Sequence, residues 1–311
     1  MRAFIVPRFG DVGAVGDRPK PEPGEGQLLV RVRAAGVNAM DPIIRGGFAK
    51  DFMEHRLPIT PGMDYAGTVE SVGPGVEGFA VGDEIFGLEG KPYFGEGTFA
   101  EYVAVTAGLA ARRPGGLAPE AAAALPTAGG TALAAVDALG AQPGDTIAVV
   151  GAAGGVGSFA VQLAALRGLN VVAVTRAQHA QYVRDLGAAW VIDYTKGDVA
   201  EQLRSKAPDG LAGIIDVFHD AQGLLALAPA VKPGGTIVTP AAMGVDQAFA
   251  GRPVKAKGVQ AAVDRVGELG ELAAAGSLKV DVEVLPFERA ADAIHRMSTK
   301  GNRGKLVLSV G

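Results

Sequence analysis

The chain has 311 residues, of which 48% are hydrophobic and 20% charged, a composition typical of globular proteins with room for two domains. A net charge of −4 gives no sign of a nucleic-acid partner, and the absence of cysteine excludes disulfides, thiolate catalysis and Cys-ligated metals. No uncharged apolar stretch is long enough to cross a membrane, and the N-terminus lacks the apolar centre of a secretory signal, so we expect no membrane partner and cytoplasmic residence.

The first part of the chain, up to about residue 117, has the pattern of a β domain. Residues 27–34 alternate apolar and polar side chains, as a half-buried strand does, and residues 65–72 and 98–105 form similar runs. Gly-Pro and Gly-Asp pairs separate these runs at short intervals, which is typical of a sheet or barrel. We expect Tyr65, inside one of these runs, to pack in the core.

From about residue 118 the pattern changes to alternating helices and strands. Pro119 and Pro126 each precede a helical run, and the apolar residues 146–150 predict a strand that is buried on both faces. Further strands are predicted at 171–175, 190–193, 213–218 and 235–239, with helices at 156–167 and 178–186. This alternation builds βαβ units, so the predicted fold class is α/β with a doubly wound parallel sheet.

The C-terminal tail predicts a strand from Val282, a helix over 288–297 and a strand over 305–310. A short strand pair of this kind fits the β domain better than the parallel sheet. We therefore expect residues 1–117 and 266–311 to form one domain and residues 118–265 the other.

A glycine-rich loop follows the buried strand 146–150 and precedes a helix. Glycines let the backbone approach an anion, and a helix N-terminus offers unpaired N–H groups and a partial positive charge. We expect the loop to bind the pyrophosphate of a dinucleotide through Ala152, Ala153, Gly154, Gly155 and Val156. The GxGxxG pattern is incomplete, because Ala152 holds its first position, and a tight turn without a ligand is the alternative.

The end of the next strand favours NADPH over NADH as the cofactor. An NAD site usually carries a carboxylate there for the ribose 2′-hydroxyl, whereas this chain has Thr175 and Arg176. A guanidinium pairs well with a 2′-phosphate, and His179 and Tyr194 are predicted to line the same pocket. The alternative is a solvated surface arginine.

Several motifs in one order carry a resemblance that covers nearly the whole chain. They are the runs 34–41, 61–69, 81–83, 97–102, 125–133, 151–157 and 303–305. On these motifs the chain resembles the zinc-free branch of the medium-chain dehydrogenase/reductase superfamily, and most closely its quinone oxidoreductases, the zeta-crystallin-like group. The resemblance implies a Rossmann-type nucleotide-binding domain and a mainly β GroES-like barrel domain.

The resemblance also places the zinc ligands of metal-containing relatives. A cysteine stands there at the position of Asn38, a His-Glu pair at Met63-Asp64, and a third ligand near Thr127. None of these residues here is a zinc ligand of the required kind. Together with four widely spaced histidines, this predicts a protein without a metal site.

Without a Lewis acid, a conjugated acceptor is easier to reduce than an isolated ketone. We therefore expect NADPH-dependent reduction of a small hydrophobic quinone or α,β-unsaturated carbonyl. The resemblance places Asn38 under the nicotinamide, and Asn38 and Asp41 are the predicted catalytic residues. The alternatives are an Asn that satisfies loop backbone groups and an Asp that caps a helix.

The resemblance implies further cofactor contacts along the chain. They lie at the start of the second helix, at the ends of the fourth and fifth strands and in the last loop. The residues are Thr127, Thr131, His219, Ala221, Pro240, Ala241, Ala242 and Asn302. His219 is either a proton donor near the nicotinamide or a buried neutral histidine, whereas His55 and His295 are expected to be solvated. Four aromatic residues are placed in loops: Phe48, Phe52, Tyr93 and Phe94. They either line a hydrophobic entrance to the substrate site or pack in the core.

Two further expectations concern partners and competing functions. Residues 254–262 are expected to form a sixth strand whose edge pairs with a second copy, so we expect a homodimer, although Lys255 and Lys257 oppose such pairing. The competing functions are an enoyl-thioester reductase, whose phosphate track Arg45, Lys50 and Arg56 would supply, and a non-catalytic NADPH-binding protein.

Overall fold

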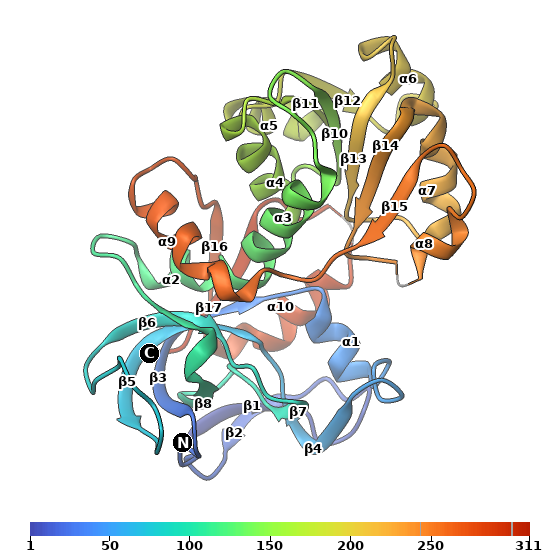
Figure 1. Ribbon diagram of the computed structural model, residues 1–311. Coiled ribbons are helices and arrows are strands. Elements are labelled where there is room, and N and C mark those ends of the chain that lie inside the picture. The colour runs from blue at the N-terminus through green and yellow to red at the C-terminus, as the bar shows by residue number, and fades with distance from the viewer. Residues whose placement is uncertain (243, 300) are drawn as a thin grey trace. The chain divides into compact units, whose positions relative to one another are not determined.

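The computed structural model describes residues 1–242, 244–299 and 301–311. The chain divides into two compact units, one made of Met1–Thr127 with Val263–Gly311 and the other of Ala128–Ala262. The sequence placed these boundaries at 117/118 and 265/266. Figure 1 shows that the first unit is built mostly of strands and that the second alternates strands and helices.

The main sheet of the first unit has seven strands. Its order is β16-β17-β3-β5-β6-β9, and β8 also pairs with β3. Two smaller sheets pair β1 with β2 and β4 with β7. The strands are β1 (Arg2–Ile5), β2 (Ala14–Asp17), β3 (Gln27–Val37), β4 (Glu54–Thr60), β5 (Asp64–Val72), β6 (Glu84–Leu88), β7 (Tyr93–Glu96), β8 (Tyr102–Thr106), β9 (Ala110–Arg112), β16 (Val282–Pro286) and β17 (Lys305–Ser309).

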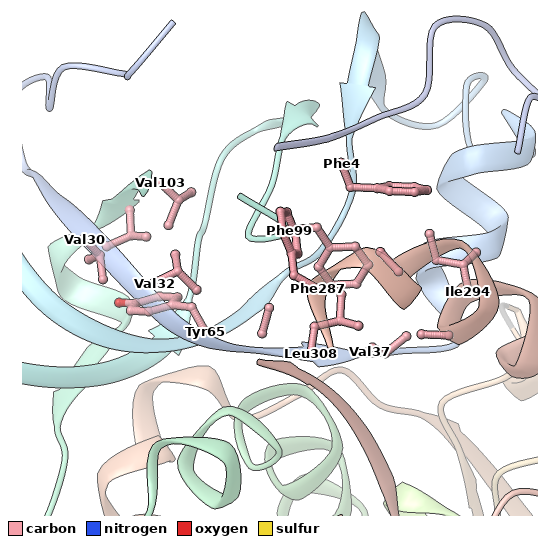
Figure 2. Packing of buried hydrophobic residues seen from close by; sticks show 14 of the residues in the cluster. Phe4, Val30, Val32, Val37, Tyr65, Phe99, Val103, Phe287, Ile294 and Leu308 are labelled. Carbon is pink, nitrogen blue, oxygen red and sulfur yellow. The ribbon is translucent and has the colours of Figure 1, made fainter. Parts of the chain in front are cut away.

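The C-terminal tail completes this sheet, as the sequence predicts. β17 pairs antiparallel with β3, Leu306 facing Val37, and β16 pairs parallel with β17. The apolar faces of these strands enclose one core with Phe4, Tyr65, Phe99 and Phe287, all at most 3% exposed. Figure 2 shows these side chains gathered in a single cluster. Burial of this much apolar surface is what holds the distant tail segment to the first hundred residues.

Four helices belong to the first unit: α1 (Met40–Gly46), α2 (Pro119–Ala123), α9 (Val266–Ala274) and α10 (Ala290–Met297). The approach of α2 to the sheet depends on Gly36. A Cβ at this position would lie 2.2 Å from the Ala123 carbonyl oxygen and 3.0 Å from Asp64 Cβ. Only glycine therefore lets β3 pass this close to both α2 and β5.

The second unit contains a six-stranded parallel sheet in the order β12-β11-β10-β13-β14-β15. Its strands are β10 (Thr146–Val150), β11 (Asn170–Thr175), β12 (Trp190–Asp193), β13 (Leu211–Asp216), β14 (Val231–Thr239) and β15 (Lys255–Gly258). The helices are α3 (Pro126–Leu139), whose first residues lie in the first unit, α4 (Gly155–Leu166), α5 (Ala180–Asp185), α6 (Val199–Lys206), α7 (Ala221–Leu227) and α8 (Val245–Ala248). The order reverses between β10 and β13, which confirms the doubly wound α/β class.

The structure corrects several local predictions. The run 98–105 enters the sheet only at Tyr102, because Phe99 turns into the core and donates its N–H to Pro61. Tyr93 and Phe94 lie in β7 and not in loops. His55 is half-buried and not fully exposed as predicted, since its Nε2 is buried and its ring packs edge-on against Phe9 and Phe94.

Candidate active site

The glycine loop joins β10 to α4 at the carboxyl edge of the parallel sheet. Gly151 has φ +80°, a conformation that favours glycine. A Cβ on Gly157 would lie 2.2 Å from the Gly151 carbonyl oxygen and 2.8 Å from Ala152 Cα, so the helix packs directly on the loop backbone. No side chain of the described residues caps α4 at Gly154. The loop therefore presents an uncapped helix N-terminus, the backbone geometry that binds phosphates.

Arg176 and Tyr194 lie at the same edge, beside this loop. Arg176 follows β11 and Tyr194 follows β12, the two neighbouring parallel strands. Arg176 Nε donates to the Tyr194 hydroxyl at 2.7 Å, which leaves the terminal guanidinium nitrogens for another acceptor. Thr175, at the end of β11, is buried, and His179 lies half-buried in the short turn that follows.

A histidine and a buried aspartate lie after β13, across the reversal in strand order. His219 Nδ1 lies 2.8 Å from Asp216 Oδ2, and Asp216 Oδ1 accepts the N–H groups of Phe218 and His219. Asp216 is fully buried, whereas the His219 side chain is 33% exposed. The aspartate thus orients a partly exposed imidazole at the edge where such sheets bind ligands.

The remaining predicted cofactor contacts lie at several places. Thr131 is buried in α3, and Ala221 is the first residue of α7, one residue after its Asp220 cap. Residues 240–242 follow β14, where the Thr239 hydroxyl accepts the Ala241 N–H. Asn302, in the first unit, donates to the Arg296 carbonyl. Contact of these residues with a cofactor stays a prediction.

The first unit contains a connected group of five polar residues, here called the Asn38 network: Asn38, Asp41, Asp64, Thr127 and Lys305. Asn38 Nδ2 donates to Asp64 Oδ2 at 2.9 Å, and Lys305 Nζ donates to Asn38 Oδ1 at 2.5 Å. Asp64 Oδ1 accepts the hydroxyl and the N–H of Thr127 at 2.6 and 3.1 Å. Lys305 Nζ also donates to the Val37 carbonyl at 2.7 Å and lies 4.0 Å from Asp64 Oδ2.

Asp41 joins this network through the backbone. Its Oδ2 accepts the Asn38 N–H at 2.7 Å, and its Oδ1 accepts the Gly62 N–H at 3.1 Å. Both oxygens are thereby occupied, and the side chain is fully buried. These bonds fix the turn that carries Asn38 into α1, and a direct catalytic role for Asp41 stays a prediction.

Burial dominates the ionisation of these groups. It raises the pKa of Asp41 to about 7, against the two backbone N–H groups and Lys305. Burial also raises the pKa of Asp64, opposed first by the Lys305 ammonium and then by its hydrogen bonds from Thr127 and Asn38. The pKa of Lys305 is lowered by burial, and the carboxyls of Asp64 and Asp41 oppose that shift.

Sequence reasoning missed Asp64, Lys305 and Asp216. The first two stand inside the motif runs 61–69 and 303–305, so the signal was present without an assigned role. Asp64 lies in the site because it is the first residue of β5 and pairs with Gly36 of β3. Lys305 lies there because it is the first residue of β17, and the next residue, Leu306, pairs with Val37 at the end of β3. Asp216, the last residue of β13, is recognisable only from its contact with His219.

The described part of the chain contains no group of three or more His, Asp or Glu side chains placed to hold a metal ion. None of its helices combines the length and apolar character needed to cross a membrane.

Comparison with known proteins agrees with this architecture. The alcohol dehydrogenase GroES-like domain family matches residues 24–115, and the zinc-binding dehydrogenase family matches residues 186–308. An Arabidopsis thaliana protein described as a chloroplastic NADPH-dependent alkenal/one oxidoreductase is 33% identical over 323 residues, covering 99% of this chain and 79% of that relative.

Two solved structures extend the similarity to the whole chain. A quinone oxidoreductase from Coxiella burnetii is 27% identical, with a TM-score of 0.89 over 100% of this chain and 99% of that chain. A protein described as an NAD-dependent alcohol dehydrogenase is 31% identical, with a TM-score of 0.90 over 100% of both chains. The fold and the nucleotide-type loop define a two-unit dehydrogenase or reductase. This chain belongs to the medium-chain dehydrogenase/reductase superfamily, with the quinone and alkenal/one oxidoreductases among its relatives.

Proposed function

We propose that this protein is an NADPH-dependent oxidoreductase that reduces a quinone or an α,β-unsaturated carbonyl. One observation carries the proposal: a guanidinium, Arg176, lies beside an uncapped glycine-loop helix, where an NAD-specific site carries a carboxylate. The acceptor class is supported by the names of the relatives, an alkenal/one oxidoreductase and a quinone oxidoreductase.

The second unit offers what a dinucleotide phosphate requires. The close packing at Gly157 holds the uncapped N-terminus of α4 directly against the backbone of the glycine loop. Arg176, oriented by Tyr194, would pair with a 2′-phosphate bidentately. Bound NADPH supplies the hydride of the reaction.

The first unit does not fit a catalytic zinc ion, and we include zinc independence in the proposal. The positions of the relatives' ligands hold Asn38, Met63-Asp64 and Thr127 in this chain. Asn38 and Thr127 are hydrogen-bonded to Asp64, and the Lys305 ammonium lies 2.5 Å from Asn38 Oδ1. A second cation there would be repelled by the ammonium, and the donor set lacks the nitrogen and sulfur ligands that zinc prefers.

Asn38 is the group we assign to the acceptor oxygen. Hydride addition to the β-carbon of an enone, or to a quinone, places negative charge on that oxygen before a proton arrives from water. A fixed N–H donor stabilises the charge without reorganising. Asn38 Nδ2 carries two hydrogens, and Asp64 accepts one of them in the described structure.

The test is NADPH consumption, followed by absorbance, with a panel of quinones, enones and enoyl thioesters after dialysis against a chelator. We expect turnover with a quinone or enone, a preference for NADPH over NADH, and no stimulation by added zinc. Binding of NADPH without turnover on any acceptor would favour the non-catalytic alternative, and activity confined to thioesters would favour an enoyl-thioester reductase.

A second candidate comes from the relative described as an NAD-dependent alcohol dehydrogenase. Alcohol oxidation with NAD⁺ that requires added zinc would establish that candidate and overturn the proposal. The Arg176 guanidinium argues against NAD⁺ as the preferred cofactor. The Lys305 ammonium beside Asn38 argues against a zinc ion at that position.

We also propose a homodimer and cytoplasmic residence. β15 is the edge strand of the parallel sheet and pairs only with β14 among the described strands. Lys257, one of the two lysines opposing such pairing, donates to the Ala138 carbonyl. An exposed edge can pair with the same edge of a second copy, which size-exclusion chromatography with light scattering would detect as twice the chain mass. Cytoplasmic residence rests on the sequence alone.

A further inference from the structure

We propose that Lys305 is a positioning residue, which acts on the reaction by fixing the orientation of the Asn38 amide. The inference rests on the proposed function for its catalytic consequence and on the Asn38 network for its geometry. It assigns Lys305 a role in the reaction, whereas the proposed function uses this residue only to argue against a zinc ion.

An asparagine amide can turn by half a rotation, exchanging its oxygen and its nitrogen. Its neighbours decide between the two orientations, because Lys donates only and an ionised carboxylate accepts only. Here the Lys305 ammonium lies 2.5 Å from Oδ1, and Asp64 Oδ2 lies 2.9 Å from Nδ2. The rotated amide would place its NH₂ group against the ammonium and its oxygen against the carboxylate. Lys305 and Asp64 together therefore permit one orientation.

The position of Lys305 is set by the fold. β17 begins at Lys305, and its register with β3 pairs Leu306 with Val37, so the lysine lies next to the residue after β3, Asn38. Gly304 has φ +59°, and a Cβ there would lie 2.4 Å from the Asp281 carbonyl oxygen. The side chain is 5% exposed, and two hydrogen bonds, to the Val37 carbonyl and Asn38 Oδ1, hold its ammonium.

This arrangement has a chemical consequence. A donor on Oδ1 polarises the amide and strengthens its remaining N–H as a donor. The buried positive charge also favours negative charge developing on a bound oxygen nearby. Because the ammonium is buried and two of its N–H groups are held by Val37 and Asn38, we assign Lys305 an action through Asn38 and not on the acceptor.

The first experiment observes the amide without any cofactor or substrate. The chain contains three asparagines, Asn38, Asn170 and Asn302, so isotope-labelled asparagine gives three pairs of side-chain amide NMR signals. The pair lost in Asn38→Ala identifies Asn38. In Lys305→Met we expect this pair alone to shift and to lose its protection from hydrogen exchange. An unchanged Asn38 signal would overturn the proposal.

Lys91→Met is the matched control, because Lys91 is also a buried lysine of the first unit. Its side chain is 4% exposed, and its ammonium donates to the carbonyls of Glu96 and Ala104 and not to Asn38. We expect this variant to lose thermal stability as Lys305→Met does, while kcat stays within about twofold of the parent, the usual scatter for sites that do not couple.

The second experiment is a kinetic double-mutant cycle. We expect Asn38→Ala to lower kcat about 100-fold and Lys305→Met about 30-fold, without change in NADPH affinity, as loss of an oriented oxyanion donor does. The double variant should be no slower than Asn38→Ala alone, because residues acting as a unit are non-additive. Multiplied effects would overturn the proposal. Absence of parent turnover would overturn the proposed function and this catalytic consequence, while the NMR result would still decide the positioning.

Discussion

The glycine loop of the second unit and the Asn38 network of the first prepare for ligands in different ways. The loop consists of consecutive residues, 151–157, and works through backbone N–H groups at a helix end. The network joins five side chains from widely separated parts of the chain, between Asn38 and Lys305. Local geometry suffices for the first, whereas the second exists only after β3, β5 and β17 have paired. The difference predicts that damage to the loop affects cofactor binding and damage to the network affects stability and turnover.

The largest effect is expected in the loop, at Gly157. In Gly157→Ala the new Cβ would meet backbone atoms 2.2 and 2.8 Å away, so the loop must move off α4. We expect NADPH affinity to fall at least about 100-fold, measured by fluorescence titration, because the phosphate cradle depends on this close packing.

Gly154→Ala sharpens that result, because its Cβ would lie 3.5 Å from the nearest atom, the Gly151 oxygen. This variant should keep its melting temperature within about 2 °C and still bind NADPH more weakly, because the added methyl group stands at the helix N-terminus to which we assign the phosphate. A fully active Gly157→Ala protein would contradict the assignment of the loop to phosphate binding.

The next effect concerns cofactor choice. Arg176→Ala should raise the KM for NADPH about 30-fold and leave the KM for NADH nearly unchanged, because one charge-assisted phosphate contact is lost. Arg184→Ala, an exposed arginine of α5, is the matched control and should change neither value. Equal effects of Arg176→Ala on both cofactors would remove the basis for the phosphate assignment.

Substitutions in the Asn38 network should lower the stability of the fold. Asp64→Asn deprives the buried Lys305 ammonium of the carboxylate that lies 4.0 Å away, so that only the more weakly acting carboxyl of Asp41 remains. We expect the free energy of unfolding to fall by about 3 kcal/mol in urea denaturation, as when one partner of a buried pair is removed. If the double variant Asp64→Asn with Lys305→Met recovers stability, the uncompensated charge of Lys305 is the cause of the loss seen in Asp64→Asn alone.

Thr127→Val removes one hydrogen bond to Asp64 and should lower the free energy of unfolding by about 1 kcal/mol.

The last expected effect is a dependence of stability on pH, of about the same size as the effect of Asp64→Asn. Burial raises the pKa of Glu89 to about 7 from its ordinary 4.5, so the folded protein holds this proton more tightly than the unfolded chain. The resulting stability is complete below pH 4.5 and is lost as the pH rises through 7.

Glu89→Gln tests this dependence with little change in shape, since its amide oxygen can still accept the Lys91 N–H. Between pH 5 and 8, Glu89 should account for up to about 3 kcal/mol of the parent's loss of unfolding free energy, and the variant should lack this part of the loss. The variant keeps the part that comes from Asp41, whose pKa burial also raises to about 7. Parallel curves for parent and variant would contradict the assignment of the proton to Glu89.

Much of the fold could be predicted because its signals are local. The apolar run 146–150 and the glycines after it predicted β10, the loop and α4, and the tail was correctly assigned to the β sheet. The error at 98–105 has a physical reason: Phe99 is apolar because it fills the core from a turn and not from a strand. Exposure of His55 was also predicted wrongly, because the two rings that cover it come from other segments.

The sequence by itself determined the α/β class, the position of the nucleotide-type loop and the place of Asn38 shortly after a predicted strand run. These depend on residue type and short spacing, which are properties of a local segment. Only the tertiary structure decided which groups surround Asn38. Lys305 lies 267 residues away in the chain, and strand pairing alone brings its ammonium to 2.5 Å from the amide oxygen. Contacts of this separation are set by the register of β17 on β3, which depends on burial of the whole sheet.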